Sequence, residues 1–439
     1  MRRWPSGGLW RHGDFLKLWS AETISQFGTQ VSQLALPFVA IVVLEASPFA
    51  VAALGTVEFL PFLLFTLPAG VWVDRLPRRA ILIVADYGRA ALLFTVPVAY
   101  ALDELTMGQL YVVGFLVGTF TVFFDVSYQS YLPALVDRER IIEGNSKLEV
   151  SRTTAQITGP GVSGGLIGLV TAPYAVLLDA ISFLGSGLFL QSIKKVELKP
   201  VTAGDKPRMR SELKEGLQYV VHHPLLRPQA LCTGTSNFFS NVTFAVFLVY
   251  AVRVLDLSAA EVGVIFTIGG LGGLAAALTS QRITRRFGVG RTTIATALTW
   301  GSAAFLVPLA PQDFPHPFLV AFGLISSFAI VVYNITQVSL RQAITPERIQ
   351  GRMNSVMRFL VWGTIPLGSL AGGALGSTIG LRETLFVGAT GGLLAGLPII
   401  LSRSQRTLVQ IPEPEPEDTV PQGPGDLATV MPAPATPDP

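Results

Sequence analysis

The sequence predicts an all-helical integral membrane protein with twelve transmembrane helices in two pseudo-symmetric halves of six. Half of its 439 residues are apolar and only 14% are charged, which is too little charge to cover a soluble protein of this length. Apolar runs of about 20 residues, the length that crosses a bilayer as a helix, recur along the whole chain. A weak internal repeat relates the first half of the chain to the second.

The apolar runs predict spans one to twelve in chain order. They cover residues 24–44, 49–73, 80–100, 110–128, 148–170, 175–193, 231–252, 259–280, 292–311, 318–340, 356–379 and 385–401. The fifth is the weakest, because Glu149 and Arg152 interrupt its start.

The internal repeat joins residues 132–141 to residues 340–349, which share a Leu at the start and Glu-Arg-Ile at the end. An Asn-Ser pair and then a glycine-rich apolar stretch follow each copy. Both copies lie between apolar runs, so the repeated unit is a block of membrane helices. A duplicated helical block is typical of secondary transporters, whose substrate site lies between the halves.

The positive charges predict the orientation. Apart from Arg89, Arg253 and Arg382, the Lys and Arg residues lie in the terminal segments, in alternate loops or in the helix ends beside them. The positive-inside rule then puts both termini in the cytoplasm. We expect a multi-pass protein of the bacterial cytoplasmic membrane whose basic clusters face anionic headgroups rather than nucleic acid.

Five segments follow from this pattern. They are a cytoplasmic N-terminal segment (1–14), a six-helix bundle (15–193), a cytoplasmic linker (194–227), a second bundle (228–402) and a cytoplasmic tail (403–439). The linker contains a plausible amphipathic helix at 212–221, which would lie on the membrane surface. The tail is rich in Pro and Glu, a composition typical of disorder.

Ionisable residues inside the spans are the first candidates for proton coupling, because such a charge costs about 2.5–3.5 kcal/mol at the bilayer centre. The candidates are Glu22, Glu58, Asp86, Arg89 and Asp125. Asp86 and Arg89 are one turn apart and can pair on one helix face, which favours a structural pair over a proton relay. Glu58 has no local partner, and burial favours the protonated form of a lone carboxyl, so Glu58 is the best single candidate for a proton carrier.

Polar residues beside aromatic ones suggest where a substrate binds. Span one offers Gln26, Gln30 and Gln33, and span seven offers Asn237, Phe238 and Asn241. Such a mixture suits an amphiphilic ligand in a mostly apolar cavity. Hydrogen bonding and packing between helices is the alternative role for each of these residues.

The loop between spans two and three carries a second kind of signal. Gly70, Asp74, Arg75, Arg78 and Arg79 are spaced as Gly-x-x-x-Asp-Arg-x-x-Arg-Arg. This spacing resembles the loop motif of the major facilitator superfamily, which in that family gates the cytoplasmic side by charge pairing. The alternative is that these four charged residues have no role in gating and only follow the positive-inside rule.

Span five contains Gly159, Pro160, Gly164 and Gly165, with Ser163 in the place of a further glycine. The segment resembles the Gly-Pro-x-x-Gly-Gly motif of drug antiporters in the same superfamily. The resemblance implies packing against span eight, which carries glycines at 269, 270, 272 and 273. A helix-packing motif with no influence on the direction of transport is equally consistent with these residues.

The resemblance covers residues 15–401. Segments at 58–61, 86–89, 128–136 and 351–355 look like the macrolide-efflux and enterobactin-exporter branch of bacteria. The resemblance implies a major facilitator fold and export of a drug, a macrolide-like antibiotic or a siderophore. It also implies that the proton gradient drives the export and that no cofactor is needed.

We expect a functional monomer that is not an enzyme and has no catalytic or metal site. An importer or uniporter of the same fold is the main alternative, and the membrane subunit of an ATP-driven exporter is a second. The chain contains no Gly-x-x-x-x-Gly-Lys-[Ser/Thr] motif, so it carries no ATPase domain of its own.

Overall fold

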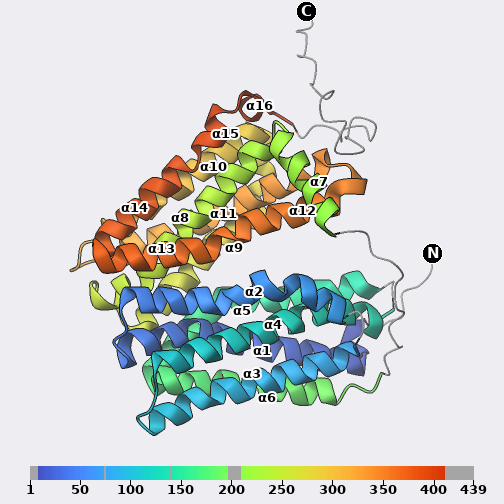
Figure 1. Ribbon diagram of the computed structural model, residues 1–439, viewed down its shortest axis with the longest axis vertical. Helices are drawn as coiled ribbons and strands as arrows, with labels where there is room; N and C mark the ends of the chain where they lie inside the picture. Colours follow the sequence, from blue (N-terminus) through green and yellow to red (C-terminus); the bar gives the residue numbers. More distant parts are fainter. Residues whose placement is uncertain (1–7, 74–75, 138–139, 196–208, 411–439) are drawn as a thin grey trace, which may run out of the picture.

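A computed structural model describes residues 8–73, 76–137, 140–195 and 209–410 (Figure 1). Within these residues the chain is helical with no β-strand, and ten helices are long and apolar enough to cross a membrane. The predicted all-helical membrane architecture is therefore confirmed.

The first six long helices pack together in the lower part of Figure 1. They are α1 (Gly13–Phe38), α2 (Pro48–Val73), α3 (Arg78–Ala101), α4 (Met107–Leu135), α5 (Ile141–Val170) and α6 (Ala172–Gln191). A short 3-10 turn, η1 (Leu9–Arg11), precedes α1, and a π-helical segment, η2 (Val39–Val43), extends it. Helix α1 packs on α5 and α6, α3 packs on α4 and α6, and α2 packs on α4. We call these helices the first group.

The second group lies in the upper part of Figure 1. It contains α8 (Leu226–Arg253), α9 (Ala259–Phe287), α10 (Val289–Ala303), η4 (Ala304–Leu306), α11 (His316–Ile344), α12 (Glu347–Trp362), α13 (Thr364–Thr378), α14 (Leu381–Leu394), α15 (Leu397–Leu401) and α16 (Arg403–Arg406). Helix α8 packs on α13 and α14, and α11 packs on α9 and α10.

The helix α7 (Met209–His222) precedes the second group and packs on α12. It contains the predicted amphipathic helix at 212–221, and Val220 on its packed face is 1% exposed. Part of the predicted linker, residues 196–208, and most of the predicted tail, residues 411–439, lie outside the described residues.

Three spans end earlier than predicted or are interrupted within their predicted range. The ninth leaves α-helical geometry after Ala303, the eleventh breaks after Trp362 and the twelfth breaks after Leu394. Each break comes four to five residues before a proline, at positions 308, 366 and 398. Proline has no N–H for the carbonyl four residues back and its ring crowds that carbonyl, so the helix loses its regular bonding there.

Most other spans are longer than predicted. The helix α1 begins at Gly13 instead of residue 24, because polar residues continue the helix beyond the apolar run. Lys17 donates to the Asp14 carboxylate across one turn at 3.0 Å, and the His12 side chain accepts from the Phe15 N–H. Such pairs and caps extend a helix where hydropathy gives no signal.

The two groups meet along two seams, α5 against α9 and α2 against α13. The side-chain bonds across the second seam join the first two turns of α2 to α13. Ser369 donates to the Ala52 carbonyl at 3.0 Å, and Ser377 accepts from the Phe49 N–H at 3.2 Å. Arg253 adds two bonds from the end of α8 to the carbonyls of Ile41 and Ala46 at 2.9 and 2.8 Å.

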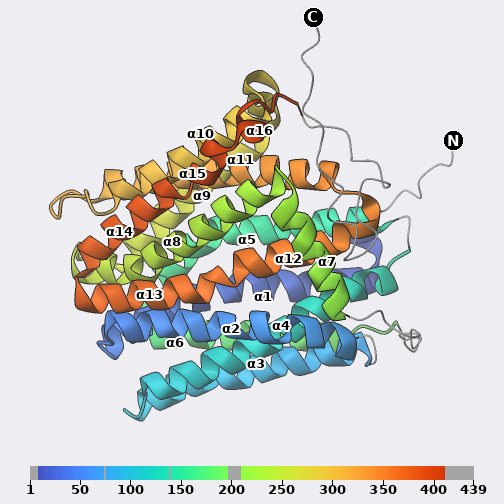
Figure 2. The same cartoon turned by 45° about the horizontal axis from the view of Figure 1, so that its top comes forward.

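These contacts all lie at one end of the molecule, which we call the latch end. Figure 1 shows the groups close together there and diverging toward the end that carries α7. The turned view in Figure 2 shows α13 lying along α2 at the latch end. A buried apolar cluster crosses from one group to the other at the same end, with Val39 and Val249 both 0% exposed.

Candidate functional site

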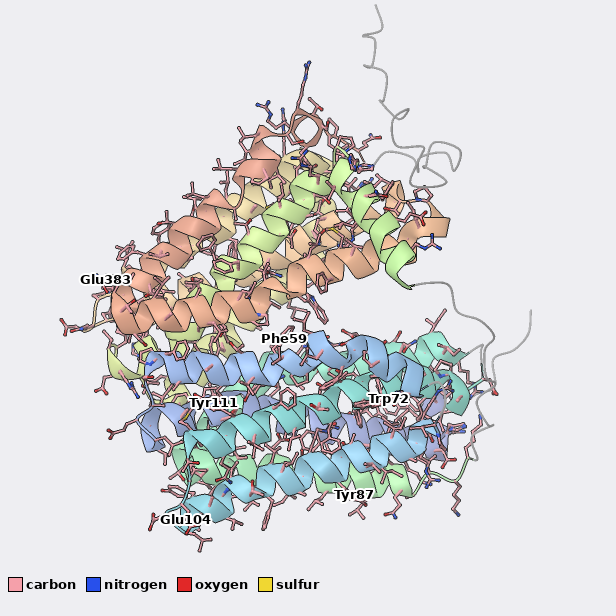
Figure 3. The ribbon with its side chains drawn as sticks, in the orientation of Figure 1. Phe59, Trp72, Tyr87, Glu104, Tyr111 and Glu383 are labelled. Atoms are coloured by element: carbon pink, nitrogen blue, oxygen red, sulfur yellow. The ribbon has the colours of Figure 1, made fainter. Side chains whose placement is uncertain are left out.

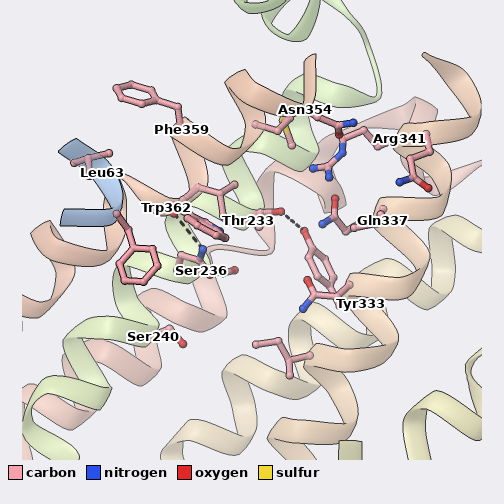
Figure 4. Close-up of a pocket in the computed structure, with 18 of the residues that line it drawn as sticks. Leu63, Thr233, Ser236, Ser240, Tyr333, Gln337, Arg341, Asn354, Phe359 and Trp362 are labelled. Atoms are coloured by element: carbon pink, nitrogen blue, oxygen red, sulfur yellow. Dashed lines mark hydrogen bonds between the residues drawn. The ribbon is translucent and has the colours of Figure 1, made fainter. Parts of the chain in front are cut away.

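A cavity of about 1170 Å³ lies between α2 and the helices α8, α10, α11 and α12 (Figure 4). Its apolar wall is rich in aromatic rings. Phe59 and Phe62 of α2 stack at 5.6 Å, and Trp362 of α12 meets Phe59 edge-on at 6.1 Å. Trp300 also lines the cavity, on α10, which packs against α11. This wall gives a ligand broad apolar surfaces with preferred ring geometries.

The opposite wall is polar and comes mainly from α11. Tyr333, Gln337 and Arg341 are four residues apart, a spacing that puts them on one helix face. The Tyr333 and Thr233 hydroxyls lie 2.8 Å apart and join this face to α8. Figure 4 shows Tyr333, Gln337 and Arg341 on the side of the cavity away from Leu63 of α2.

Gln337 is the residue of this wall with an unmet hydrogen-bonding group. Its side chain is 5% exposed, and its Oε1 accepts no hydrogen bond from any described residue. A buried acceptor without a donor is costly, and a ligand hydroxyl or N–H can remove that cost.

The charges at the cavity are positive. Arg341 and Arg352 line it, and the lining contains no Asp or Glu among the described residues. Arg352 reaches across to α7, where it forms an ion pair with Glu215. That bond ties the linker helix to the rim of the cavity.

Of the predicted substrate contacts, Asn237 lines this cavity, and its side chain donates to the Val361 carbonyl at 3.1 Å. Asn241, one turn further along α8, donates to the Asn237 carbonyl at 2.8 Å, on the face that meets α13 at Gly368. Phe238 borders a separate groove between α7, α8 and α12. Neighbouring residues of a helix point in different directions, so the predicted cluster is divided among three surfaces.

The predicted glutamines of span one do not line the cavity. Gln26 donates to Glu22 at 2.7 Å, and Gln30 packs against Gly159 of α5, while Gln33 is exposed. Gln26 and Gln30 therefore serve contacts inside the first group.

The predicted pairing of Asp86 with Arg89 is present as a buried ion pair, at 0% and 3% exposure. The Arg89 guanidinium also lies over the rings of Phe124 and Phe183, at 4.4 and 4.0 Å from their centroids. Asp125 is within electrostatic range of Arg89. The pair is thus the centre of a polar cluster inside the first group.

Asp179 of α6 belongs to the same cluster and was missed by the sequence analysis. It is 1% exposed, accepts from Ser182 at 3.0 Å and faces Gly28 of α1. The signal was available, because an acid inside the run 175–193 is as unexpected as one in any other span.

Glu58 lies at the interface of α2 with α4, where it contacts Gly114 and Gly118. Its Oε1 is buried and accepts no hydrogen bond from any described residue. The next residue, Phe59, lines the cavity. Glu58 therefore lies beside the cavity wall but faces the neighbouring helix.

Two residues of the predicted gate motif, Asp74 and Arg75, lie outside the described residues, and Gly70 is in the last turn of α2. Arg78 begins α3. Arg79 donates to the carbonyl oxygens of Leu190 and Gln191, at the end of α6. A cation beside the last carbonyls of a helix satisfies free acceptors there.

The glycine motif of span five lies at two contacts. A Cβ on Gly164 would collide with the Ala259 carbonyl of α9, whereas one on Gly159 would collide with Gln30 of α1. Pro160 lies inside α5, and its carbonyl contacts Gly263 of α9. Gly165 has open space at its Cβ position, so it takes no part in close packing.

The predicted packing of span five against span eight is present, but mostly through other glycines of α9. Gly263 makes the close approach to α5, and Gly270 contacts Ile157. Gly269 and Gly272 face α11, where a Cβ on Gly272 would collide with the Leu324 carbonyl and one on Gly269 would be in tight contact with Gly323. The glycine-rich segment therefore serves two interfaces.

Among the described residues, no group of three or more His, Cys, Asp or Glu side chains could hold a metal ion. The single cysteine, Cys232, is buried in α8.

Membrane-length helices, with a cavity between α2 of the first group and four helices of the second, define the general class as a multi-pass membrane protein. Residues 8–427 match the family described as transmembrane secretion effector. The chain belongs to that family.

Known proteins of similar sequence are transporters. The chain is 26% identical over 420 residues to the multidrug efflux pump Tap of Mycolicibacterium fortuitum, which covers 91% of this chain and 98% of that pump. It is 22% identical over 353 residues to the enterobactin exporter EntS of Citrobacter koseri, covering 79% and 82%.

Solved structures share the fold. A bacterial homologue of the iron transporter ferroportin in an inward-facing state superposes with a TM-score of 0.74 at 16% identity, covering 91% of this chain and all of that one. The nucleoside transporter NupG superposes with a TM-score of 0.68 at 14% identity, covering 89% of this chain and 98% of that one.

Proposed function

We propose that this protein exports amphiphilic small molecules across the bacterial cytoplasmic membrane in exchange for protons, by alternating access to the cavity. The relatives named as an efflux pump and an exporter support the direction of transport. The class of substrate follows from the cavity, whose aromatic wall faces a polar one.

The proposed topology has twelve spans in two halves of six, with both termini in the cytoplasm. The ten candidate spans become twelve when α5 and α10 are counted. Polar residues at the start of α5 and the early end of α10 explain why these two helices fall short on length or hydropathy. We expect the protein to act as a monomer, because each chain has its own cavity.

The observation that carries the proposal is the position of the cavity relative to the seams. The groups are joined at the latch end, and the cavity lies toward the end that carries α7. With the basic linker in the cytoplasm, the cavity opens inward, so a substrate enters from the cytoplasm. Export then requires the latch end to open and the α7 end to close.

The proton is proposed to bind in the first group, with the proton gradient as the only energy source. Glu58 is the first candidate, because its Oε1 is buried without a hydrogen-bond donor among the described residues and the next residue lines the cavity. Asp86, Arg89, Asp125 and Glu22 form the second candidate site.

The proposal is tested by uptake of a labelled macrolide into inside-out vesicles energised with a proton gradient. We expect uptake that a protonophore abolishes and that Glu58→Gln reduces at least about tenfold. Glu104→Gln, an exposed acid in the loop after α3, is the matched control and should leave uptake unchanged.

Uptake that survives the protonophore but requires ATP would support the membrane subunit of an ATP-driven exporter instead. Accumulation in intact cells rather than in inside-out vesicles would support an importer or uniporter. If Glu58→Gln transports at the normal rate with normal protonophore sensitivity, the proton site lies in the Asp86 cluster or elsewhere.

A further inference from the structure

We propose that the groove between α7, α8 and α12 binds one anionic phospholipid of the inner leaflet, with its phosphate at Arg227 and an acyl chain along α8. The groove has a volume of about 560 Å³, within the range of about 300–1,000 Å³ that ligand pockets have. The inference uses the proposed orientation of the protein in the membrane and is independent of the proposed substrate.

The first argument is the length of the groove. It follows one face of α8, where its lining residues are spaced three or four residues apart. At about 1.5 Å per residue, the helix rises about 16 Å from Arg227 to Phe238, the first and last of them. That length is about half of the roughly 30 Å hydrocarbon core of a bilayer, so the groove matches one leaflet.

The second argument is the apolar surface of the groove. Leu217 and Val221 of α7 and Leu231 of α8 line it, and all three side chains are exposed. Leu360 of α12 lines the other side. Gly234 adds no side chain, and the nearest atom to a Cβ there would be the Leu360 carbonyl oxygen at 3.8 Å, so the groove keeps its depth. Exposed apolar side chains that gather around a groove mark a binding surface, and a hydrocarbon chain fits it.

The third argument is the charge at one end of this surface. Arg227, in the first turn of α8, is the one charged residue among the described residues that line the groove, and it is exposed. No ion pair or side-chain hydrogen bond joins it to another described residue. Glu215, the acid of α7 whose side chain is described, is paired with Arg352 of α12. A guanidinium without an acidic partner suits a phosphate, to which it donates two parallel hydrogen bonds.

The position of Arg227 along the chain gives the depth of this charge in the membrane. The predicted seventh span begins at residue 231, shortly after Arg227. Helix α7 lies against α12 at the end away from the latch end (Figure 1). With that end in the cytoplasm, the guanidinium lies at the level of the headgroups of the inner leaflet, which carries the anionic lipids.

A lipid in the groove would also support the cavity. Gly234 lines the groove and the preceding residue, Thr233, lines the cavity. On α12, Leu360 and Val361 are divided between the groove and the cavity in the same way. The groove and the cavity therefore share α8 and α12 as walls, and an acyl chain that fills the groove holds these two helices and α7 in place.

The test measures binding of single lipids to the purified full-length protein in detergent micelles by native mass spectrometry. The probes are phosphatidylglycerol and phosphatidylcholine with the same two acyl chains. We expect phosphatidylglycerol to bind about fivefold more tightly, because the choline cation offsets the phosphate charge at Arg227. Arg227→Gln should remove this preference, and Arg227→Lys should keep most of it. Gly234→Leu, which fills the groove, should weaken both lipids.

Two control variants make the same changes elsewhere. Arg291 is exposed in the first turn of α10 and lines neither the groove nor the cavity, so Arg291→Gln should leave the preference unchanged. Gly185 of α6 has open space at its Cβ position, so Gly185→Leu should leave both lipids unchanged. Thermal unfolding of each variant checks that it is folded.

Equal binding of the two lipids to the unchanged protein would overturn the inference, as would an equal loss of preference in Arg227→Gln and Arg291→Gln. If Gly234→Leu lowers macrolide uptake while lipid binding stays normal, the groove serves the transported substrate and the inference is wrong. Because binding is measured without transport, it can fail while the proposed function stands, and the reverse.

Discussion

Arg253 should hold the latch end closed, and its removal should shift the protein toward the state that opens there. The side chain leaves the last residue of α8 in the second group and donates to Ile41 and Ala46 of the first. Both acceptors are backbone carbonyls in the connection from α1 to α2, so the bonds survive any change of acceptor side chain. They must break when the groups separate at this end.

The size of the effect follows from the two bonds. A hydrogen bond from a charged donor contributes about 1.5–3 kcal/mol when it is shielded from water. Arg253 is exposed overall, so water replaces part of what is lost. We therefore take about 1.5 kcal/mol for both bonds together, which changes the ratio of closed to open molecules about tenfold.

The assay is a distance measurement between spin labels on the two groups. Glu104 and Glu383 are exposed, belong to different groups and lie at the same end of the molecule (Figure 3). Cys232→Ala removes the single native thiol, so only the introduced cysteines react. Arg253→Ala should move population from the short distance to a longer one, about tenfold in their ratio.

Arg382 provides a matched control. It donates to the Pro308 carbonyl at 2.8 Å, but both residues belong to the second group. Arg382→Ala therefore removes a similar bond without affecting the contact between groups. The reasoning is refuted if Arg253→Ala leaves the distance distribution unchanged, or if Arg382→Ala shifts it equally.

Two further predictions concern a close helix contact and a buried ion pair. Gly164→Val should abolish transport, measured by vesicle uptake, because the larger side chain forces α5 and α9 apart. Gly165→Val should transport normally, because the Cβ of residue 165 has open space. Equal activity of the two variants would contradict the close contact between α5 and α9. Arg89→Leu should leave buried carboxylates without their cation and destabilise the fold by about 3–5 kcal/mol, measured by thermal unfolding. Adding Asp86→Asn should recover much of that loss, and no recovery would show that the pair is not the source.

The helices could be predicted from the sequence because a membrane helix depends on a property summed over about 20 residues. Their ends could not, because single residues decide them. The Asp14–Lys17 pair continues α1 through a polar segment, and a proline four residues past Leu394 ends α14. Hydropathy averages over both effects.

The glycine motif shows a second limit. Gly164 and Gly165 are equivalent in the sequence, but one meets the backbone of α9 and the other meets open space. Which face of a helix meets a neighbour depends on rotation about its axis. That rotation is fixed by the packing of the whole bundle, which a local motif does not contain.

The cavity was the least predictable part. The predicted substrate contacts lie in spans one and seven, where polar and aromatic residues are adjacent in the sequence. The polar face instead comes from Tyr333, Gln337 and Arg341, which are four residues apart and have both apolar and polar residues between them, in the most hydrophobic span. A polar residue at every fourth position of an apolar run is the signal to look for, because this period puts the residues on one face.

The helix α2 is the element best placed to couple a proton to a substrate. In the first turns of α2, the Ala52 carbonyl accepts a hydrogen bond from α13 at the latch end. Near the middle of the helix Glu58 contacts α4, and the next residue, Phe59, lines the cavity. Gly118 leaves no room between α4 and the Glu58 backbone, so a change of charge at Glu58 acts on a close helix contact. Because α2 is one continuous helix through these points, we expect a shift at Glu58 to reach both the cavity wall and the seam. A proton site and a substrate site with no shared residue can then still depend on each other.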